Sequence, residues 1–364
     1  MLDKIKKFTL QMMVGANIAT IIVMLITGFC YRLNPQEHPI MANMGLAFPV
    51  PLIVNAAFLV VFLVVKRRLV VVPILGFVAC YIPVRIYTPL NVPHSAPEDA
   101  IKVMSYNVFF FNNADGKGMK QIADYVNGSG AAIVCMQEAK YDDDVIAHFK
   151  DSYKYMDTLR TTGKAGEVQL VLSKYPILSK SRINTDLKGC LCGAYEILID
   201  GDRTTVINCH LEGSGLSLDD RQEIRNFVKG GWKSDTIATD SKRMIVRLGE
   251  SSARRVPQVE GIIKYIKSRK DEPVLFFGDM NDNPLSYCHS LMAHTLTDCY
   301  EATANGPGIS YHYNAIYVRI DNIMCSSHWQ PYNFKVDRQI AVSDHYPIWG
   351  YVKKSQLKGK KSPR

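Results

Sequence analysis

Residues 273–284 read PVLFFGDMNDNP. The five residues from Val274 to Gly278 are apolar and rich in aromatic side chains, which is typical of a buried β-strand. The acid Asp279 and the amide Asn281 follow at once. A carboxylate directly after a buried strand costs folding free energy unless it is paired or binds a metal. The segment therefore predicts either a turn opened by Asp279 or a functional site at a strand end.

The same pattern recurs through residues 100–352. Apolar strand-like runs alternate with polar segments, as in IKVMSYN, AAIVCMQE and TTVINCHL. The polar residues beside these runs are Asn107, Glu138, His210, Asp279, Asn281, Asp321, Asp344 and His345. Taken singly, each has a structural alternative, since Glu138 could cap a helix and His210 could be hydrogen-bonded in the core. Their shared place at the ends of strands predicts that they converge on one polar site.

The residue types at this predicted site suit the hydrolysis of a phosphate ester. The candidate metal ligands offer oxygen atoms and include no cysteine, which suits Mg²⁺ or Mn²⁺ better than zinc. They are Glu138, Asp344, Asn107 and Asp279. Asp321 can orient the imidazole of His345, which then acts as a general base or stabilises charge on a phosphorane. The chain has no GxSxG motif, so a covalent serine mechanism has no visible nucleophile.

Strand-like runs outnumber helical ones in this region. Two segments have helical periodicity, at 119–128 and 252–267, and Val256, Val259 and Ile262 mark one face of the second. This balance predicts a two-layer sandwich of sheets with helices on the outside.

Six short motifs in order resemble the endonuclease/exonuclease/phosphatase superfamily. They are SYN, QE, NCHL, GDMNDNP, RIDNI and SDHYPI, and the resemblance covers roughly residues 100–352. It implies an α/β fold, a four-layer α/β sandwich in which two packed β-sheets are flanked by helices. It also implies a hydrolase that cleaves phosphodiesters or phosphomonoesters with Mg²⁺, or Mn²⁺, as its cofactor.

The resemblance also implies a role for each motif residue. Glu138 is the implied principal metal ligand, with Asn107 and Asp344 nearby. The implied catalytic residues are His210, Asp279, Asn281, Asp321 and His345. Asp279 would orient or deprotonate the attacking water, and Asn281, His210 and Asn107 would bind the substrate phosphate. His345, oriented by Asp321, would complete a pair of histidines.

Residues 1–87 have the composition of a membrane region with about three transmembrane helices, at 8–31, 42–65 and 69–87. The first contains 24 residues without Asp, Glu, Lys, Arg or His, enough to cross a hydrocarbon core of ~30 Å. Pro73 and Pro83 interrupt the third, for which a re-entrant segment is the alternative. A cleaved signal peptide fits poorly, because the first run is too long and two more follow.

The basic residues around these segments predict their orientation. Lys4, Lys6 and Lys7 precede the first helix and residues 66–68 fill the second connection, whereas only Arg32 lies in the first connection. By the positive-inside rule the N-terminus is cytoplasmic. Three spans then place residues 100–352 outside, on the periplasmic side of an inner membrane. Residues 88–99 contain three prolines and are expected to form a linker.

The net charge of +9 is unevenly distributed. Residues 91–352 contain 29 basic and 32 acidic residues, a net of −3, so the excess lies in the N-terminal region and in an expected disordered tail at 353–364. A duplex-binding nuclease usually needs a basic surface, so the charge does not indicate nucleic acid. A nuclease acting on extracellular nucleic acid and a catalytically silent, membrane-anchored binding module are the alternatives. The expected partners are the phosphoester substrate and the membrane, with no obligate protein partner.

Residues 212–256 form a long charged insertion before the GDMN motif. One interpretation is a solvated pair of helices on the rim of the site. The other is a lid that selects the substrate, with Arg221, Arg225 and Arg255 contacting anions.

Overall fold

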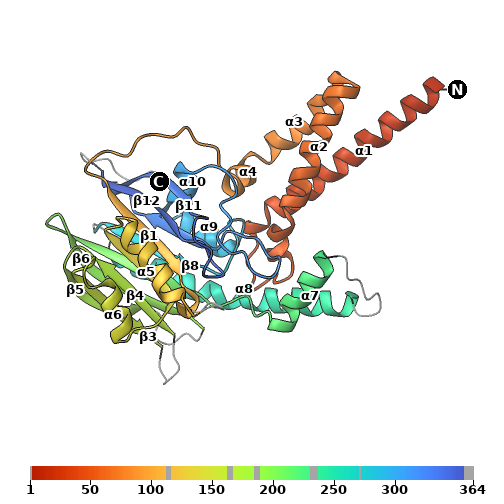
Figure 1. Cartoon of the computed structure of the whole chain (residues 1–364). Coiled ribbons are helices and arrows are strands. Elements are labelled where there is room, and N and C mark those ends of the chain that lie inside the picture. The colour runs from red at the N-terminus through yellow and green to blue at the C-terminus, as the bar shows by residue number, and fades with distance from the viewer. Residues whose placement is uncertain are drawn as a thin grey trace.

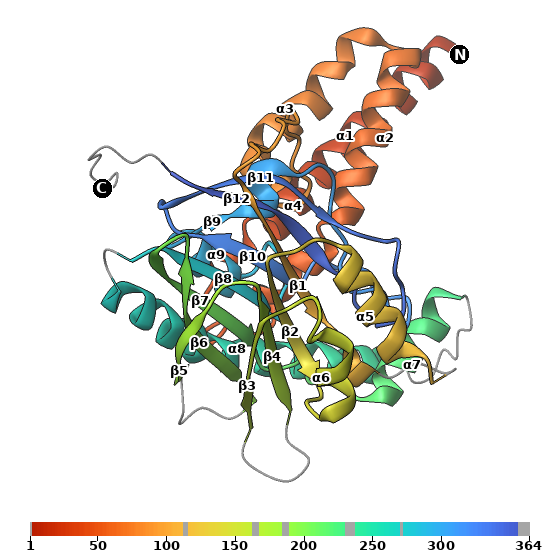
Figure 2. The same cartoon turned by 60° about the vertical axis from the view of Figure 1, so that its left-hand side comes forward.

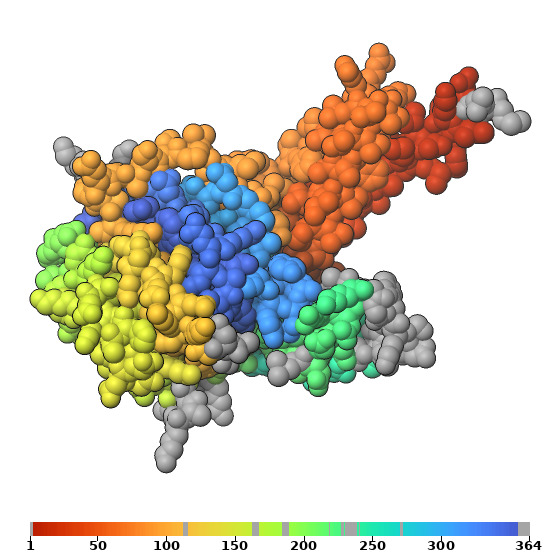
Figure 3. Space-filling model, in the orientation of Figure 1, coloured from red at the N-terminus to blue at the C-terminus, as the bar shows by residue number. Residues whose placement is uncertain are grey.

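The computed structural model describes residues 2–111, 116–161, 167–183, 189–229, 237–269 and 272–355. An α/β body carries a bundle of N-terminal helices that projects from one side, with the N-terminus at the far tip (Figure 1). The space-filling view shows the same bundle standing clear of the body along most of its length (Figure 3).

The first β-sheet has six strands in the order β11-β12-β1-β2-β4-β3. Its strands are β1 (Ile101–Asn107), β2 (Ile133–Ala139), β3 (Tyr155–Arg160), β4 (Val168–Ser173), β11 (Trp329–Val336) and β12 (Ile348–Lys354). Strands β1 and β2 are parallel, and the other neighbours are antiparallel. The polar residues Asn107 and Glu138 therefore lie at the C-terminal ends of neighbouring parallel strands, at the same edge of the sheet.

The second sheet also has six strands, in the order β5-β6-β7-β8-β10-β9. They are β5 (Ile177–Ile183), β6 (Leu191–Ile199), β7 (Asp202–His210), β8 (Val274–Asp279), β9 (Thr297–Asp298) and β10 (Asp321–Cys325). Strands β7 and β8 are the parallel pair, and their register sets His210 opposite Asp279. Asp321 pairs with Asp279 at the start of the antiparallel β10. The run YVRI was expected to be a strand that ends at Asp321, but Asp321 is instead the first residue of β10.

The two sheets pack face to face with helices on the outside. Buried side chains such as Val103 and Ile133 from the first sheet meet Val206 and Leu275 from the second. On the outer faces, α5 (Gly118–Gly128) and α6 (Asp143–Phe149) cover the first sheet, and α8 (Ile237–Ser268) and α9 (Tyr287–Ala293) cover the second (Figure 2). The short helix α10 (Cys299–Thr303) precedes β10. The predicted α/β sandwich of two packed sheets flanked by helices is confirmed.

The N-terminal region contains one helix long and apolar enough to span a membrane, α1 (Leu2–Gly28). The other two expected spans are bent pairs: η2 (Met41–Ala47) with α2 (Pro49–Val65), bent by 46°, and Arg67–Ala79 with α4 (Tyr81–Tyr87), bent by 68°. The second pair comprises η3 (Arg67–Val70) and α3 (Val71–Ala79) before its bend. Prolines at the start of α2 and inside α4 account for the breaks, because proline removes a helical hydrogen bond and clashes with the preceding turn. Counting each bent pair as one span gives up to three.

A buried polar contact joins the helices of this bundle. Asn17 of α1 donates a hydrogen bond of 2.8 Å to the side-chain oxygen of Asn55 in α2. Asn55 donates in turn to the carbonyl of Pro73 in α3, at 3.0 Å. Hydrogen bonds between side chains hold apolar helices together where no water competes. The three helices therefore form one packed unit.

The segments that flank the body are less regular than the rest. The expected linker, 88–99, has no helix or strand, and Asn91 within it donates to the carbonyls of Glu301 and Ala304. Strand β12 extends to Lys354, so the expected tail at 353–364 begins inside a strand, with Lys354 2.7 Å from Asp202. Residues 356–364 lie outside the described residues.

Candidate active site

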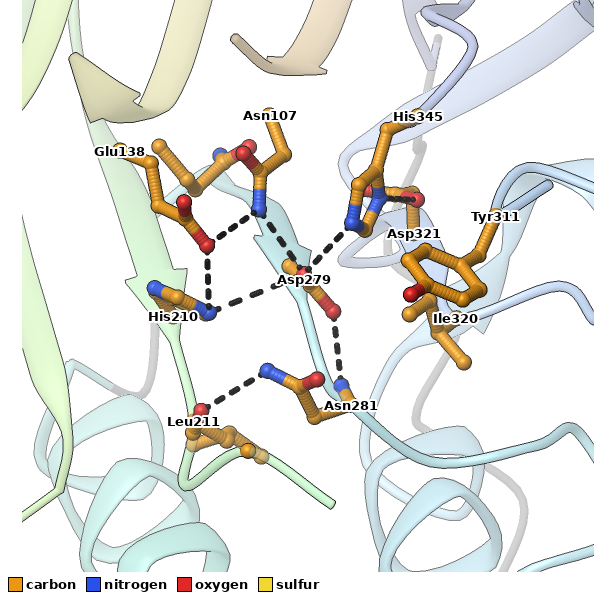
Figure 4. A network of polar contacts seen from close by, with 12 residues as sticks. Asn107, Glu138, His210, Leu211, Asp279, Asn281, Tyr311, Ile320, Asp321 and His345 are labelled. Atoms are coloured by element: carbon orange, nitrogen blue, oxygen red, sulfur yellow. Dashed lines mark hydrogen bonds and ion pairs between the residues drawn. The ribbon is translucent and has the colours of Figure 1, made fainter. Parts of the chain in front are cut away.

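The ends of the two parallel strand pairs bring the predicted site residues together. Asn107, Glu138, His210 and Asp279 point toward one another, and His345 lies on the other side of Asp279 (Figure 4). A buried hydrogen bond of 2.8 Å from Gln137 to Asn208 joins the two sheets beside them. The site therefore lies where both sheets end, as the strand-end pattern predicts.

Asn107 connects the two carboxylates at the centre of the site. Its side-chain Nδ2 donates to Oε1 of Glu138 and to Oδ2 of Asp279, both at 3.1 Å. Its Oδ1 accepts a hydrogen bond from the backbone N–H of Phe109 at 3.1 Å. In this arrangement the amide nitrogen of Asn107 holds the two carboxylates close together, and its oxygen is occupied by the backbone N–H of Phe109.

His210 is held between acids on both of its ring nitrogens. Nδ1 lies 2.8 Å from Oε1 of Glu167, and Nε2 lies 3.8 Å from Glu138 and 3.7 Å from Asp279. Burial alone would lower the pKa of His210, but Glu167 and Asp279 hold it well above its ordinary value. These acids favour the protonated form of His210 and orient its ring toward the two central carboxylates.

Sequence reasoning missed Glu167. It stands directly before β4, which is antiparallel to β2, with Val168 paired to Ala139. The start of an antiparallel strand lies at the same edge as the end of its neighbour. Searching only the ends of strands overlooked this residue, and an acid before an antiparallel strand is the signal that could have found it.

His345 forms the second oriented histidine. Its Nδ1 lies 2.7 Å from Oδ2 of Asp321, and its Nε2 lies 3.6 Å from Asp279 and 4.0 Å from Asp344. Burial would lower the pKa of His345, but the charges of Asp321 and Asp279 raise it to about 10. Asp321 fixes the ring so that Nε2 faces the central acids.

Two site residues adopt strained backbone conformations. Glu138 has a φ of 48° and Asn281 a φ of 50°, in the left-handed region that non-glycine residues seldom occupy. The backbone N–H of Asn281 donates to Asp279 at 2.8 Å, and its side chain donates to the carbonyl of Leu211 at 3.0 Å. These contacts hold the loop after β8 against the end of β7.

The charged insertion contacts the site through one of its helices, α7 (Leu218–Val228). Arg221 donates to the hydroxyl of Tyr311 at 2.7 Å, and the ring of Tyr311 lies edge-on to His345 with 5.0 Å between centroids. Arg225 is exposed on the same helix. Arg255 is no surface anion contact, because it is 2% exposed and lies 3.3 Å from Asp282.

The donor set fits a hard divalent cation. Among the described residues, Asp279, Asp321 and His345 place ligand atoms within 4.8 Å of one another. Asp321 is already paired with His345, so Asp279, Glu138 and Asp344 are the carboxylates left to face an ion. Burial raises the pKa of Glu138, with Asp279 adding to the shift and His210 opposing it. A divalent cation would relieve this crowding of acids.

Residues 104–345 match the Endonuclease/Exonuclease/phosphatase family, and residues 10–87 match a domain of unknown function, DUF8431. No curated protein matches the sequence of the chain.

Two solved structures with a TM-score of 0.50 share the fold at low sequence identity. An endonuclease/exonuclease/phosphatase from Bacteroides vulgatus is 15% identical, with a TM-score of 0.50 over 71% of this chain and 100% of that one. A protein of the same description from Beutenbergia cavernae is 14% identical, with a TM-score of 0.50 over 70% and 72%. D. rerio TDP2, solved with a single-strand DNA product, is 15% identical, with a TM-score of 0.49 over 71% and 100%.

The site generates a prediction about metal binding. Electron paramagnetic resonance of free Mn²⁺, titrated with the purified full-length protein, should show one tight site per chain. Asp279→Asn should weaken it about tenfold or more, because the substitution removes a central carboxylate charge. Asp202→Asn is the matched control, since Asp202 pairs with Lys354 away from the site. Equal Mn²⁺ affinity in both variants would contradict a metal site at Asp279.

Proposed function

We propose, since this chain belongs to the endonuclease/exonuclease/phosphatase family, that it is a membrane-anchored phosphoesterase that depends on a divalent metal. It hydrolyses a phosphodiester by metal-assisted attack of water. The observation that carries the proposal is the convergence of two central carboxylates, Glu138 and Asp279, with two histidines that are each oriented by a further acid.

Each site residue has a role in this reaction. Glu138 and Asp279 would hold Mg²⁺ or Mn²⁺, with Asp344 and Asn107 beside them, and the ion would polarise a phosphoryl oxygen. Asp279 also accepts a proton from the attacking water. Protonated His210 and the amide of Asn281 bind the non-bridging phosphate oxygens.

His345 completes the charge stabilisation. Asp321 keeps its ring fixed and its pKa high, so the imidazolium is in place before negative charge develops on the phosphorane. Because His345 and Asp321 are buried and already paired, little reorganisation is needed as the transition state forms.

Two observations favour a phosphoester on a lipid head group or a small organic molecule. Leu285, four residues after Asn281, packs against Met24 and Phe48 near the ends of α1 and α2. Four residues span at most about 14 Å, so the site lies close to the membrane region. Residues 91–352 carry a net charge of −3, so a long polyanion such as a nucleic acid is not attracted to them by net charge. The alternative is a more specific activity, that of a nuclease acting on extracellular nucleic acid.

The arrangement of the helices supports an orientation in the membrane. The N-terminus and the turn between α2 and α3 lie at the outer end of the bundle, and the α/β body lies at the other end (Figures 1 and 2). Basic residues cluster at that outer end, including Lys4, Lys6 and Arg67. With three spans and the basic end in the cytoplasm, the body would lie on the periplasmic side of the inner membrane.

Hydrolysis of bis-p-nitrophenyl phosphate tests the activity directly. Full-length protein in detergent should turn over this diester with Mn²⁺ or Mg²⁺ and lose the activity on chelation. Glu138→Ala and His345→Ala should each lower kcat at least about 100-fold, because one removes a metal ligand and the other removes a preorganised charge.

The same assay separates the enzyme from a catalytically silent binding module. A folded protein that binds Mn²⁺ would be the module if it released no p-nitrophenol from this diester and hydrolysed none of a panel of phospholipids, inositol phosphates, DNA and RNA. Turnover that is unchanged in both variants would assign the activity to a contaminant.

Alkaline phosphatase fusions test the orientation. A fusion after Lys102 should be active in Escherichia coli, because the reporter folds only outside the cytoplasm. A fusion after Arg68, in the second connection, should be inactive and serves as the matched control. The reverse pattern would place the α/β body in the cytoplasm.

A further inference from the structure

The connection between α1 and α2 is inserted into the α/β body. It includes η1 (Cys30–Arg32) and η2. The Sγ of Cys30 donates to the carbonyl of Leu285 at 3.4 Å. Leu285 is fully buried in a cluster with Met24, Tyr31 and Phe48. This leucine lies in the loop that follows Asp279 and joins β8 to α9, so the N-terminal region contacts that loop directly.

Gly45 of η2 lies against the backbone of this loop. A Cβ atom at this position would stand 2.9 Å from the carbonyl oxygen of Leu285 and 3.0 Å from Oδ1 of Asn283. That Oδ1 accepts the backbone N–H of Leu285 at 2.9 Å and so shapes the turn. Any side chain at residue 45 would have to displace the loop or the helix.

The same connection contacts α8 on its other side. A Cβ on Gly249 would stand 2.9 Å from the carbonyl oxygen of Pro39. Ser252 of α8 donates to Oδ1 of Asn43 at 3.0 Å. Residues 39–45, called here the docking segment, are therefore held between α8 and the loop that carries Asn281.

Arg255 extends this contact to both loops of the site. Its Nη2 donates to Ser252 at 2.7 Å, and its Nε donates to Asp282 at 3.3 Å. Its Nη1 donates to the carbonyl of Glu212 at 3.0 Å. Asp282 follows Asn281 directly, and Glu212 lies two residues after His210. A buried arginine with this many partners fixes their relative positions. Losing Asp282 would leave its charge unpaired, and losing Ser252 or the Glu212 carbonyl would leave a buried N–H donor unsatisfied.

We propose that the docking segment is a positioning element of the active site. It holds the loop from Asp279 to Leu285 and, through Ser252 and Arg255, the loop after His210. The N-terminal region is thus a part of the catalytic unit as well as an anchor. This inference rests on the proposed function, because it takes Asp279 and Asn281 to act on the substrate.

Glycine substitutions in the full-length protein test the proposal. Gly45→Val should lower kcat about tenfold to 100-fold in the Mn²⁺-dependent hydrolysis of bis-p-nitrophenyl phosphate, since small displacements of catalytic groups have effects of this size. KM should change less than kcat. Gly15→Val is the matched control, because a Cβ at residue 15 meets nothing within 4 Å, and its kcat should match the wild type.

Asn43→Ala supplies a second variant that adds no volume. It removes the hydrogen bond with Ser252 and should lower kcat a few-fold while the thermal unfolding temperature stays near the wild-type value. If Gly45→Val fails to fold, this variant decides the question. Unchanged kcat in folded Asn43→Ala, or in folded Gly45→Val, would overturn the positioning role.

The outcomes keep the two proposals apart. A wild-type protein without metal-dependent turnover would contradict the proposed function itself. An active wild type with equal kcat in Gly45→Val and Gly15→Val would leave the function standing and overturn only the role of the docking segment.

Discussion

The rest of the site depends on one electrostatic constraint, the crowding of five carboxylates into a largely buried space. Each of them approaches one of the two histidines within 4.0 Å, and they are Glu138, Glu167, Asp279, Asp321 and Asp344. Carboxylates gathered around the same two rings repel one another, which disfavours their ionisation unless cations compensate. The histidines in their protonated form, together with the divalent ion proposed above, would supply that compensation. The same groups that make the cluster tolerable in the folded protein are those that can stabilise a phosphoryl transition state.

The constraint explains the architecture around the cluster. Two parallel strand pairs, one in each sheet, end at the same place, and Gln137 and Asn208 join the sheets there. Glu138 and Asn281 have strained backbone conformations next to packed strands. Hydrogen bonds to Asp279 and to the carbonyl of Leu211 hold Asn281 in place. The loop after β8 is in turn fixed by Arg255 and by the connection between α1 and α2. Packed contacts therefore join the N-terminal helices to the site.

Much of this could be predicted from local sequence, and the remainder depends on long-range pairing. Alternating apolar runs indicated the sheets, and polar residues beside them located Asn107, Glu138, His210 and Asp279. Glu167 and Tyr311 were missed because their place depends on antiparallel register and on a bridge to His345. The contact between Gly45 and Leu285 joins residues far apart in the chain, and neither neighbourhood carries a signal for it. The prolines of the third hydrophobic stretch were identified as interruptions, but the bend in the second stretch was not predicted.

Thermal unfolding with and without Mn²⁺ tests the central claim, that crowded acids make this site and a divalent cation relieves it. Ionised Glu138 is disfavoured by burial and by Asp279, so Glu138→Gln should unfold at a higher temperature than the wild type without metal. Saturating Mn²⁺ should raise the wild-type unfolding temperature and leave the variant nearly unchanged, which reverses their order. A variant that is less stable without metal, and that gains as much from Mn²⁺ as the wild type does, would contradict the account.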